Sequence, residues 1–154
     1  MFRIKTEIDG NRRFKARLVI KGYLQRKGID YAEIFSPVVK LTSTRILLSV
    51  VASENLHLEQ MDVKTAFLHG DLDKRIYTQQ PKVFVVPGNE HMVFKLTRSL
   101  YGLKQAPRQW YKKFDSFMTK TGFCKAEKDP CCYFKKYTDS YVFLLLYVDD
   151  MLIA

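Results

Sequence analysis

The stretch YVFLLLYVDDMLI, residues 141–153, decides the fold that we expect for this chain of 154 residues. It holds two apolar runs that read as strands, Tyr141–Val148 and Met151–Ile153, with Asp149 and Asp150 between them. Aspartates are common turn residues, which favours a plain hairpin. Two adjacent carboxylates also repel, by about 1 kcal/mol at ~4 Å in water and by more at low dielectric constant. A turn packed against an apolar sheet would need a cation, so a hairpin turn and a metal site both stay open.

A third carboxylate, Asp62, lies near the end of another run that reads as a short strand, Leu56–Val63. A carboxylate at a strand end is placed to face the aspartate pair across a sheet. Three oxygen donors without histidine or cysteine suit Mg²⁺ or Mn²⁺ and not zinc. Two such ions can clamp a phosphoryl transfer, one at the attacking hydroxyl and one at the leaving pyrophosphate. Residue spacing alone does not establish that Asp62 meets Asp149.

Mixed strands and helices in the rest of the chain indicate an α+β domain with an antiparallel sheet. We expect a first helix over residues 42–54, with three candidate N-caps, Thr42, Ser43 and Thr44. Pro107 opens a second helix, which ends at Gly122. Two further segments, Phe14–Ile20 and Cys131–Lys135, read as strands. The predicted apolar face of the second helix consists of Trp110, Phe114, Phe117 and Met118.

The net charge of +10 at pH 7 is unevenly distributed along the chain. Residues 1–28 carry +7 and residues 95–136 carry +8, whereas residues 29–94 carry −2 and residues 137–154 carry −3. Basic segments beside clustered carboxylates favour a polyanion held near the aspartates, although a basic surface also serves solubility. No apolar run reaches the roughly 18 residues that cross a membrane, and the N-terminus has no signal-peptide pattern. We therefore expect no membrane partner and an intracellular protein.

Six blocks follow one another along the chain: KARLVIKGY at 15–23, GIDY at 28–31, FSPV at 35–38, QMDVKTAFLHG at 60–70, LYGLKQAPR at 100–108 and YVDDMLI at 147–153. In this order they resemble the successive blocks of the reverse transcriptases of copia-type LTR retrotransposons. The resemblance covers residues from about 14 to 154. No single block is decisive, but together they are specific.

The resemblance implies a right-hand polymerase fold in which fingers are interleaved with a palm, whose antiparallel sheet packs on helices. Residues 1–154 would form a partial reverse transcriptase domain that is truncated before the thumb. The implied activity is RNA-directed DNA polymerisation, in which two Mg²⁺ or Mn²⁺ ions promote nucleotidyl transfer from a dNTP to a primer 3′-hydroxyl. Implied partners are dNTPs, an RNA or DNA template with its primer, and the other Pol polyprotein domains, namely thumb, ribonuclease H and integrase. The family also implies a cytoplasmic virus-like particle.

The resemblance assigns the catalytic and metal-binding roles residue by residue. Asp62, Asp149 and Asp150 would be the catalytic carboxylates and would bind the metal ions, with Asp150 the least direct ligand. The backbone carbonyl of Val63 would complete the metal site. Phe67 would close the floor of the sugar pocket and exclude a 2′-hydroxyl, whereas a buried core ring is the alternative reading of the same residue.

The resemblance also implies two groups of substrate-binding residues. Tyr101 and Gly102 belong to the block that would support the template and the incoming nucleotide. Lys15 or Arg17 would reach the triphosphate, and a solvated strand face is the alternative for both. The cations expected to contact nucleic-acid phosphates without sequence preference are Lys104, Arg108, Lys112 and Lys113.

The chain departs from the family at Val83, where the block around Gln80–Phe84 usually has a glycine. A valine held at a positive φ would strain this turn by about 1–3 kcal/mol. Two alternatives to a working polymerase stay open. The chain could be a non-catalytic remnant of such an element that at most binds nucleic acid. It could also be an unrelated basic nucleic-acid-binding module in which the aspartates are turn residues, which the three intact aspartates disfavour.

Overall fold

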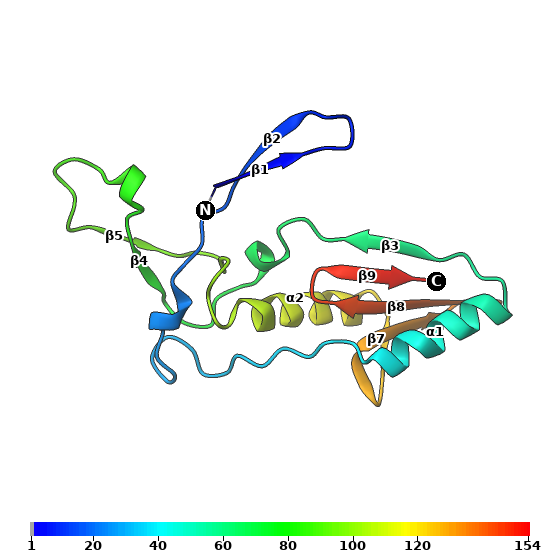
Figure 1. Ribbon diagram of the computed structural model, residues 1–154. Helices are drawn as coiled ribbons and strands as arrows, with labels where there is room; N and C mark the ends of the chain where they lie inside the picture. The colour runs from blue at the N-terminus through cyan, green and yellow to red at the C-terminus, as the bar shows by residue number, and fades with distance from the viewer. Residues whose placement is uncertain (1) are drawn as a thin grey trace.

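A five-stranded antiparallel sheet and two α-helices form the centre of the computed structural model, which describes residues 2–154 (Figure 1). The strand order is β3-β9-β8-β7-β6, so the strands on either side of the aspartate pair are neighbours within the sheet. The predicted α+β class with an antiparallel sheet is confirmed, and Met1, the first residue of the predicted domain, lies outside the described residues. The elements are α1 (Leu41–Ser53), α2 (Ala106–Lys120), β3 (Glu59–Asp62), β6 (Cys124–Ala126), β7 (Asp129–Lys136), β8 (Tyr141–Tyr147) and β9 (Asp150–Ile153).

Helix α2 packs on one face of this sheet and makes the main core. Alternate residues of β8, Leu144 and Leu146, share this face because side chains alternate along a strand. Positions four residues apart on α2 meet them, since such positions stack along one side of a helix. The buried residues of this core are Ala66, Trp110, Phe114, Met118, Cys131, Tyr133, Leu144 and Leu146.

The predicted ends of α2 are confirmed, but its apolar face differs from the prediction at one residue. Pro107 lies in the first turn, and Gly122 follows the helix with a φ of 86°. Phe117 was expected in the buried stripe but is 61% exposed. Buried positions four residues apart drift round the helix by about 40° per step, so the stripe has moved away from Phe117 at the C-terminal end of α2.

Helix α1 confirms the predicted helix, but a residue far along the chain caps it. The helix begins at Leu41, and none of the three candidate side chains caps it as an N-cap residue. Instead, Asp129 accepts hydrogen bonds from the Lys40 backbone N–H at 2.9 Å and from the Ser43 hydroxyl at 2.6 Å. The same buried carboxylate accepts a bond from the Cys131 backbone N–H at 3.0 Å. Asp129 therefore ties the start of α1 to the start of β7.

Two hairpins extend away from the central sheet (Figure 1). The first pairs β1 (Phe2–Thr6) with β2 (Arg12–Ala16), so the strand predicted over Phe14–Ile20 ends at Ala16. The second pairs β4 (Tyr77–Gln79) with β5 (Val93–Lys95). Three short 3₁₀ helices complete the elements: η1 (Gly22–Leu24), η2 (Ala66–His69) and η3 (Lys82–Phe84).

The backbone strain expected at Val83 is not found. Among residues 2–154, the non-glycine residues with positive φ are Asn55, Thr65 and Val148, and Val83 is a residue of η3. Valine is therefore accommodated at the position where the resemblance led us to expect glycine. Neither helix of the described residues has the length and apolar composition that a membrane span needs.

Replacing Asp129 with alanine should destabilise the protein by about 1–3 kcal/mol, because three hydrogen-bond donors lose their shared acceptor. Urea denaturation followed by circular dichroism measures the change. Asp139→Ala, at an exposed position in the β7–β8 turn, is the matched control and should cost under about 0.5 kcal/mol. Equal stability of the two variants would contradict the capping role.

The Asp129 contribution should also depend on pH. Burial raises the pKa of Asp129, but the hydrogen bonds from Ser43, Lys40 and Cys131 outweigh burial and hold that pKa below its ordinary value. A carboxyl whose pKa is lower in the folded state stabilises the protein above its unfolded-state pKa of about 3.9. This contribution is lost as the pH falls through the lower folded-state pKa. The stability difference between the native chain and Asp129→Ala should therefore shrink on acidification below about pH 4.

Candidate active site

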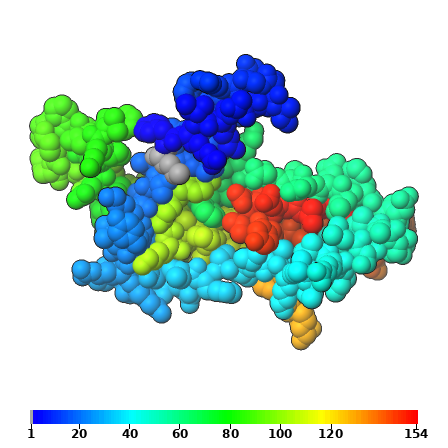
Figure 2. Space-filling view, viewed as in Figure 1, coloured from blue at the N-terminus to red at the C-terminus, as the bar shows by residue number. Residues whose placement is uncertain are grey.

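The register of the central sheet brings Asp62 and Asp150 directly opposite each other on β3 and β9. On the other side of β9, Asp150 lies opposite Tyr147 of β8. Directly opposed residues share a face of the sheet, so the three side chains belong to one face. Leu146 is in the core under α2, and its neighbour Tyr147 therefore faces away from that helix. Atoms of β9, in red, form part of the surface in this region (Figure 2).

Two residues, Val148 and Asp149, connect β8 to β9 in a tight turn. Val148 has a φ of 59°, and a positive φ at the first central position of a hairpin turn usually requires glycine. A β-branched residue held there costs about 1–3 kcal/mol. Such strain persists only where surrounding contacts hold it, and it concentrates at functional sites.

Two hydrogen bonds hold the turn. The indole Nε1 of Trp110 on α2 donates to the Val148 carbonyl at 2.6 Å. The backbone N–H of Val63, immediately after Asp62, donates to the Asp149 carbonyl at 2.8 Å. The structure thus brings all three predicted catalytic aspartates, with Val63, to the junction of β3, β9 and the turn.

The donor set at this junction fits a hard divalent cation. The proposed ligands are the side-chain carboxylates of the aspartates and the backbone carbonyl of Val63. All of them are oxygen donors, which Mg²⁺ and Mn²⁺ prefer. Within residues 2–154, however, no three histidine, cysteine, aspartate or glutamate side chains are close enough together to form a metal cluster. The backbone arrangement therefore suits the predicted site, whereas the metal ligands themselves stay a prediction.

The predicted nucleotide residues Arg17, Tyr101 and Phe67 contact one another, and Tyr101 takes part in both contacts. The Phe67 and Tyr101 ring centroids are 5.1 Å apart, and the Arg17 guanidinium lies 5.4 Å from the centroid of the Tyr101 ring. Phe67 is half-buried and packs against both hydrophobic clusters of the protein. The Phe67 ring thus contacts the core and is also partly exposed. This is compatible with both roles considered for Phe67, the floor of a sugar pocket and a core ring.

Gly102 is fixed by its backbone and by close packing. Its φ is 92°, and a Cβ atom added to it would lie 2.1 Å from the Ile20 carbonyl oxygen. In the reverse direction, a Cβ on Gly22 would lie 1.8 Å from the Gly102 carbonyl oxygen. A hydrogen bond of 2.8 Å from Ile20 N–H to the Tyr101 carbonyl joins the same two segments. Only glycine lets the loop at 101–102 lie this close to the chain that follows β2.

Lys15, the other candidate for the triphosphate, lies in a group of cations near Asp62. Its neighbours Arg17 and Lys5, with smaller contributions from burial and Arg13, lower the pKa of Lys15, and Asp62 opposes them. Cations that repel one another favour an anionic ligand among them. The opposing effect of Asp62 on the pKa of Lys15 is the smallest of these influences.

The four cations predicted to contact nucleic acid each have a partner within the protein. The Lys112 ammonium lies 2.9 Å from Asp73, and the Lys113 ammonium lies 2.6 Å from Asp71. Arg108 donates to the Phe35 carbonyl at 2.9 Å, and the Lys104 ammonium donates to the Gln25 carbonyl at 3.1 Å. Exposed ion pairs contribute at most about 1 kcal/mol, so a phosphate could replace Asp71 and Asp73 as partners of Lys113 and Lys112. Their role on nucleic acid stays a prediction.

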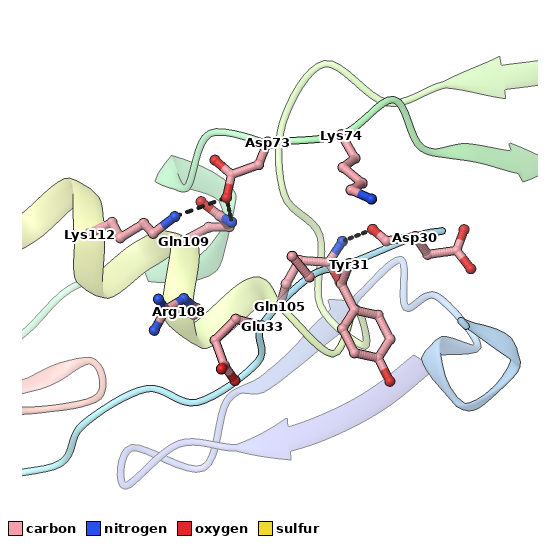
Figure 3. Close-up of a pocket in the computed structure, with 10 residues that line it drawn as sticks. Asp30, Tyr31, Glu33, Asp73, Lys74, Gln105, Arg108, Gln109 and Lys112 are labelled. Atoms are coloured by element: carbon pink, nitrogen blue, oxygen red, sulfur yellow. Dashed lines mark hydrogen bonds and ion pairs between the residues drawn. The ribbon is translucent and has the colours of Figure 1, made fainter. Parts of the chain in front are cut away.

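A pocket of about 170 Å³ adjoins two of these cations (Figure 3). Figure 3 shows Lys112 and Gln109 converging on Asp73, and the Lys112 hydrogen bond in particular holds the pKa of Asp73 below its ordinary value. Three carboxylates line the pocket together with three cations: Asp30, Glu33, Asp73, Lys74, Arg108 and Lys112. This mixed charge distinguishes the pocket from a purely basic nucleic-acid surface.

Two residues that hydrogen-bond to predicted site segments were not identified from the sequence in that role. Trp110 was predicted only as a core residue, and no local pattern indicates that its N–H reaches the Val148 carbonyl. Gln25 was not singled out, yet its side chain accepts a bond from the Lys104 backbone N–H at 2.8 Å and donates to Gln105 at 3.1 Å. These contacts join residues about 40 or 80 positions apart, so only the folded chain shows them.

The comparisons identify the family of this site. A family profile described as "Reverse transcriptase (RNA-dependent DNA polymerase)" matches residues 1–154. The chain belongs to this reverse transcriptase family. Within it, the chain is similar to the Retrovirus-related Pol polyprotein from transposon TNT 1-94 of Nicotiana tabacum, with 60% identity over 156 aligned positions. The predicted copia-type affiliation with retrotransposon Pol polyproteins is confirmed.

Other relatives are more distant. The Retrovirus-related Pol polyprotein from transposon RE1 of Arabidopsis thaliana is 45% identical over 155 positions, and the Transposon Ty1-BL Gag-Pol polyprotein of Saccharomyces cerevisiae is 30% identical over 153. The alignments cover 100%, 100% and 99% of this chain for TNT 1-94, RE1 and Ty1-BL, but 12%, 11% and 8% of those relatives. No solved structure matches the chain significantly.

Replacing Gly102 with alanine should destabilise the protein by about 2 kcal/mol or more, because alanine adds a steric overlap to the strain of a positive φ. Gly88→Ala is the matched control, since Gly88 has a φ of 81° but nothing within 4 Å of its added Cβ. Gly88→Ala should lower the free energy of unfolding by only about 1 kcal/mol. Urea denaturation compares the two, and equal costs would show that the approach of Ile20 to Gly102 does not matter.

Proposed function

We propose that this chain is the catalytic core of an RNA-directed DNA polymerase of a copia-type retrotransposon. The observation that carries the proposal is the pairing of Asp62 with Asp150 across β3 and β9, next to a strained turn that holds Asp149. Membership in the reverse transcriptase family supports the same reaction. The central sheet and α2 would be the palm, and the β1–β2 and β4–β5 hairpins would belong to the fingers.

In the proposed site, Asp62, Asp149 and the Val63 carbonyl would hold two Mg²⁺ or Mn²⁺ ions, with Asp150 beside them. Bound there, the ions would supply activation of the attacking hydroxyl and neutralisation of charge on the phosphates. The primer 3′-oxygen forms a bond to the α-phosphorus of the dNTP and gives up its proton to water. The bond from the α-phosphorus to the bridging oxygen breaks, and pyrophosphate leaves.

The proposed substrate contacts follow from the residues around the junction. Lys15 and Arg17 lie on the β1–β2 side and carry the positive charge that a triphosphate needs. Tyr101 and Gly102 form the loop that supports the incoming nucleotide. Phe67, in contact with Tyr101, forms the floor under the sugar, where a ring leaves no room for a 2′-hydroxyl.

The proposed macromolecular partners are a template with its primer and the rest of a Pol polyprotein. Lys104, Arg108, Lys112 and Lys113 would exchange their internal partners for phosphates, so binding should weaken with increasing salt. The chain spans about an eighth or less of the relatives compared above. We propose that thumb, ribonuclease H and integrase segments of such a polyprotein complete the enzyme, within a cytoplasmic particle.

Replacing Asp149 with asparagine should reduce primer extension on an RNA template by at least about a hundredfold, because a neutral amide cannot hold the metal charge. The assay uses Mg²⁺, labelled dNTPs and the native chain as reference. Asp139→Asn, in the β7–β8 turn, is the control and should extend normally. Equal extension by the native chain and Asp149→Asn would overturn the proposal. No extension by either, with both folded, would favour the alternative of a remnant that only binds nucleic acid.

Replacing Phe67 with alanine should raise the ratio of ribonucleotide to deoxynucleotide incorporation by about 10- to 100-fold, because the steric block to a 2′-hydroxyl is removed. Phe67→Val is the milder variant, chosen because Phe67 also contacts the core. Single-nucleotide incorporation with matched rNTP and dNTP gives the ratio. Unchanged sugar selectivity in a folded variant would make Phe67 a core residue only.

A further inference from the structure

Trp110 is the only tryptophan of the chain, and it lies directly beneath the aspartate turn. Its side chain is 7% exposed, and the indole N–H donates to the Val148 carbonyl at 2.6 Å. A buried indole N–H normally donates a hydrogen bond, and any acceptor in the core would satisfy it equally well. Here the partner is the carbonyl of the residue with a strained, positive φ.

The two hydrogen bonds on the turn act on successive peptide groups. Trp110 fixes the carbonyl of Val148, which belongs to the peptide group before Asp149. The Val63 N–H fixes the carbonyl of Asp149, which belongs to the peptide group after it. Peptide groups are planar, so holding one carbonyl on each side holds both backbone dihedrals of Asp149. The direction of the Asp149 Cα–Cβ bond is thereby determined.

The position of Trp110 is itself well defined. Its ring lies 5.6 Å from the Phe114 ring in the core and 6.1 Å from the His69 ring on η2, measured between centroids. The backbone at Trp110 also packs closely against Gly70, since a Cβ added to Gly70 would lie 3.0 Å from the Trp110 backbone nitrogen. The same turn of α2 therefore contacts both the segment that follows Asp62 and the turn that carries Asp149.

We infer that Trp110 is a positioning residue for the metal site: its N–H holds the strained turn so that Asp149 faces Asp62. This role rests on the proposed function, because it requires that the two carboxylates share a metal ion. Trp110 touches neither the substrate nor the metal in this role and acts only through the Val148–Asp149 peptide group. If Trp110 were only a core residue, loss of its ring would affect the protein, but loss of the indole N–H alone would leave metal binding unchanged.

Trp110→Phe keeps a ring and removes the N–H donor, so it should weaken Mn²⁺ binding about 3- to 10-fold, the loss expected from one hydrogen bond. Mn²⁺ affinity is measured on the metal alone, from the electron paramagnetic resonance signal of free Mn²⁺. Met118→Ala is the control for lost packing, since it perturbs the same core cluster, keeps the ring contacts of Trp110 and leaves the N–H in place. It should retain the affinity of the native chain.

If Trp110→Phe folds poorly, a second variant distinguishes the contribution of the indole N–H from that of the ring. Because the chain has one tryptophan, biosynthetic replacement by β-(3-benzothienyl)alanine exchanges only this N–H for sulfur at nearly constant shape. Because it has one tryptophan, the native chain should give a single indole ¹H–¹⁵N signal. That proton should exchange slowly with solvent, and its chemical shift should move on titration with Mg²⁺. An unmoved signal, or unchanged Mn²⁺ affinity in the benzothienyl chain, overturns the positioning role.

The variants distinguish failure of this inference from failure of the proposed function. If the native chain and Asp149→Asn bind Mn²⁺ equally, the aspartates hold no metal and both ideas fail. If Asp149→Asn loses binding and Trp110→Phe does not, the metal site stands and the role of Trp110 is wrong. An equal loss in Trp110→Phe and Met118→Ala would assign the effect to packing and would also overturn the inference.

Discussion

The antiparallel pairing of β3 with β9 is the constraint on which the rest of the site depends. Asp62 and Asp150 are opposite each other only in this register, because side chains alternate between the two faces of a sheet. A slip of one residue would turn Asp62 toward α2 and the apolar core. This register is held because the apolar side chains of β8 and β9 that form the core must face α2. Burial of Leu146 under α2 therefore also determines that its neighbour Tyr147 is exposed on the opposite face. Hydrophobic packing on one face thereby positions the carboxylates on the other.

A second set of contacts joins the chain after β2 to the sheet. The glycines at 22 and 102 allow two backbones to approach more closely than any side chain permits. Their approach places Tyr101 between Phe67 and Arg17, which come from segments 50 residues apart in sequence. Phe67, which packs on the core, and the Arg17 guanidinium thus both contact the Tyr101 ring.

The sequence predicted the parts of the fold that depend on local pattern. Apolar runs with turn residues between them located β8, β9 and the turn, and Pro107 with Gly122 bounded α2. The three aspartates were found as a group because the family resemblance related Asp62 to Asp149, a step that spacing alone did not support. The structure then placed them at one junction.

Interactions between distant residues could not be predicted in this way. The cap of α1 comes from Asp129, 89 positions after Lys40, and the support of the turn comes from an indole 38 positions before Val148. Charge counting likewise showed the cations of α2 but not that Asp71 and Asp73 lie beside them. A side chain's partner depends on the packed fold, and short-range patterns contain little of that information.

The most direct test of this account is a crystal structure of the chain grown with Mn²⁺ and measured at a wavelength where manganese scatters anomalously. We expect Asp62 to pair with Asp150 across β3 and β9. We also expect at least one anomalous peak within about 2.5 Å of carboxylate oxygens of Asp62 and Asp149. A correct register without a peak would contradict the metal site, and a different register of β3 on β9 would contradict the account as a whole.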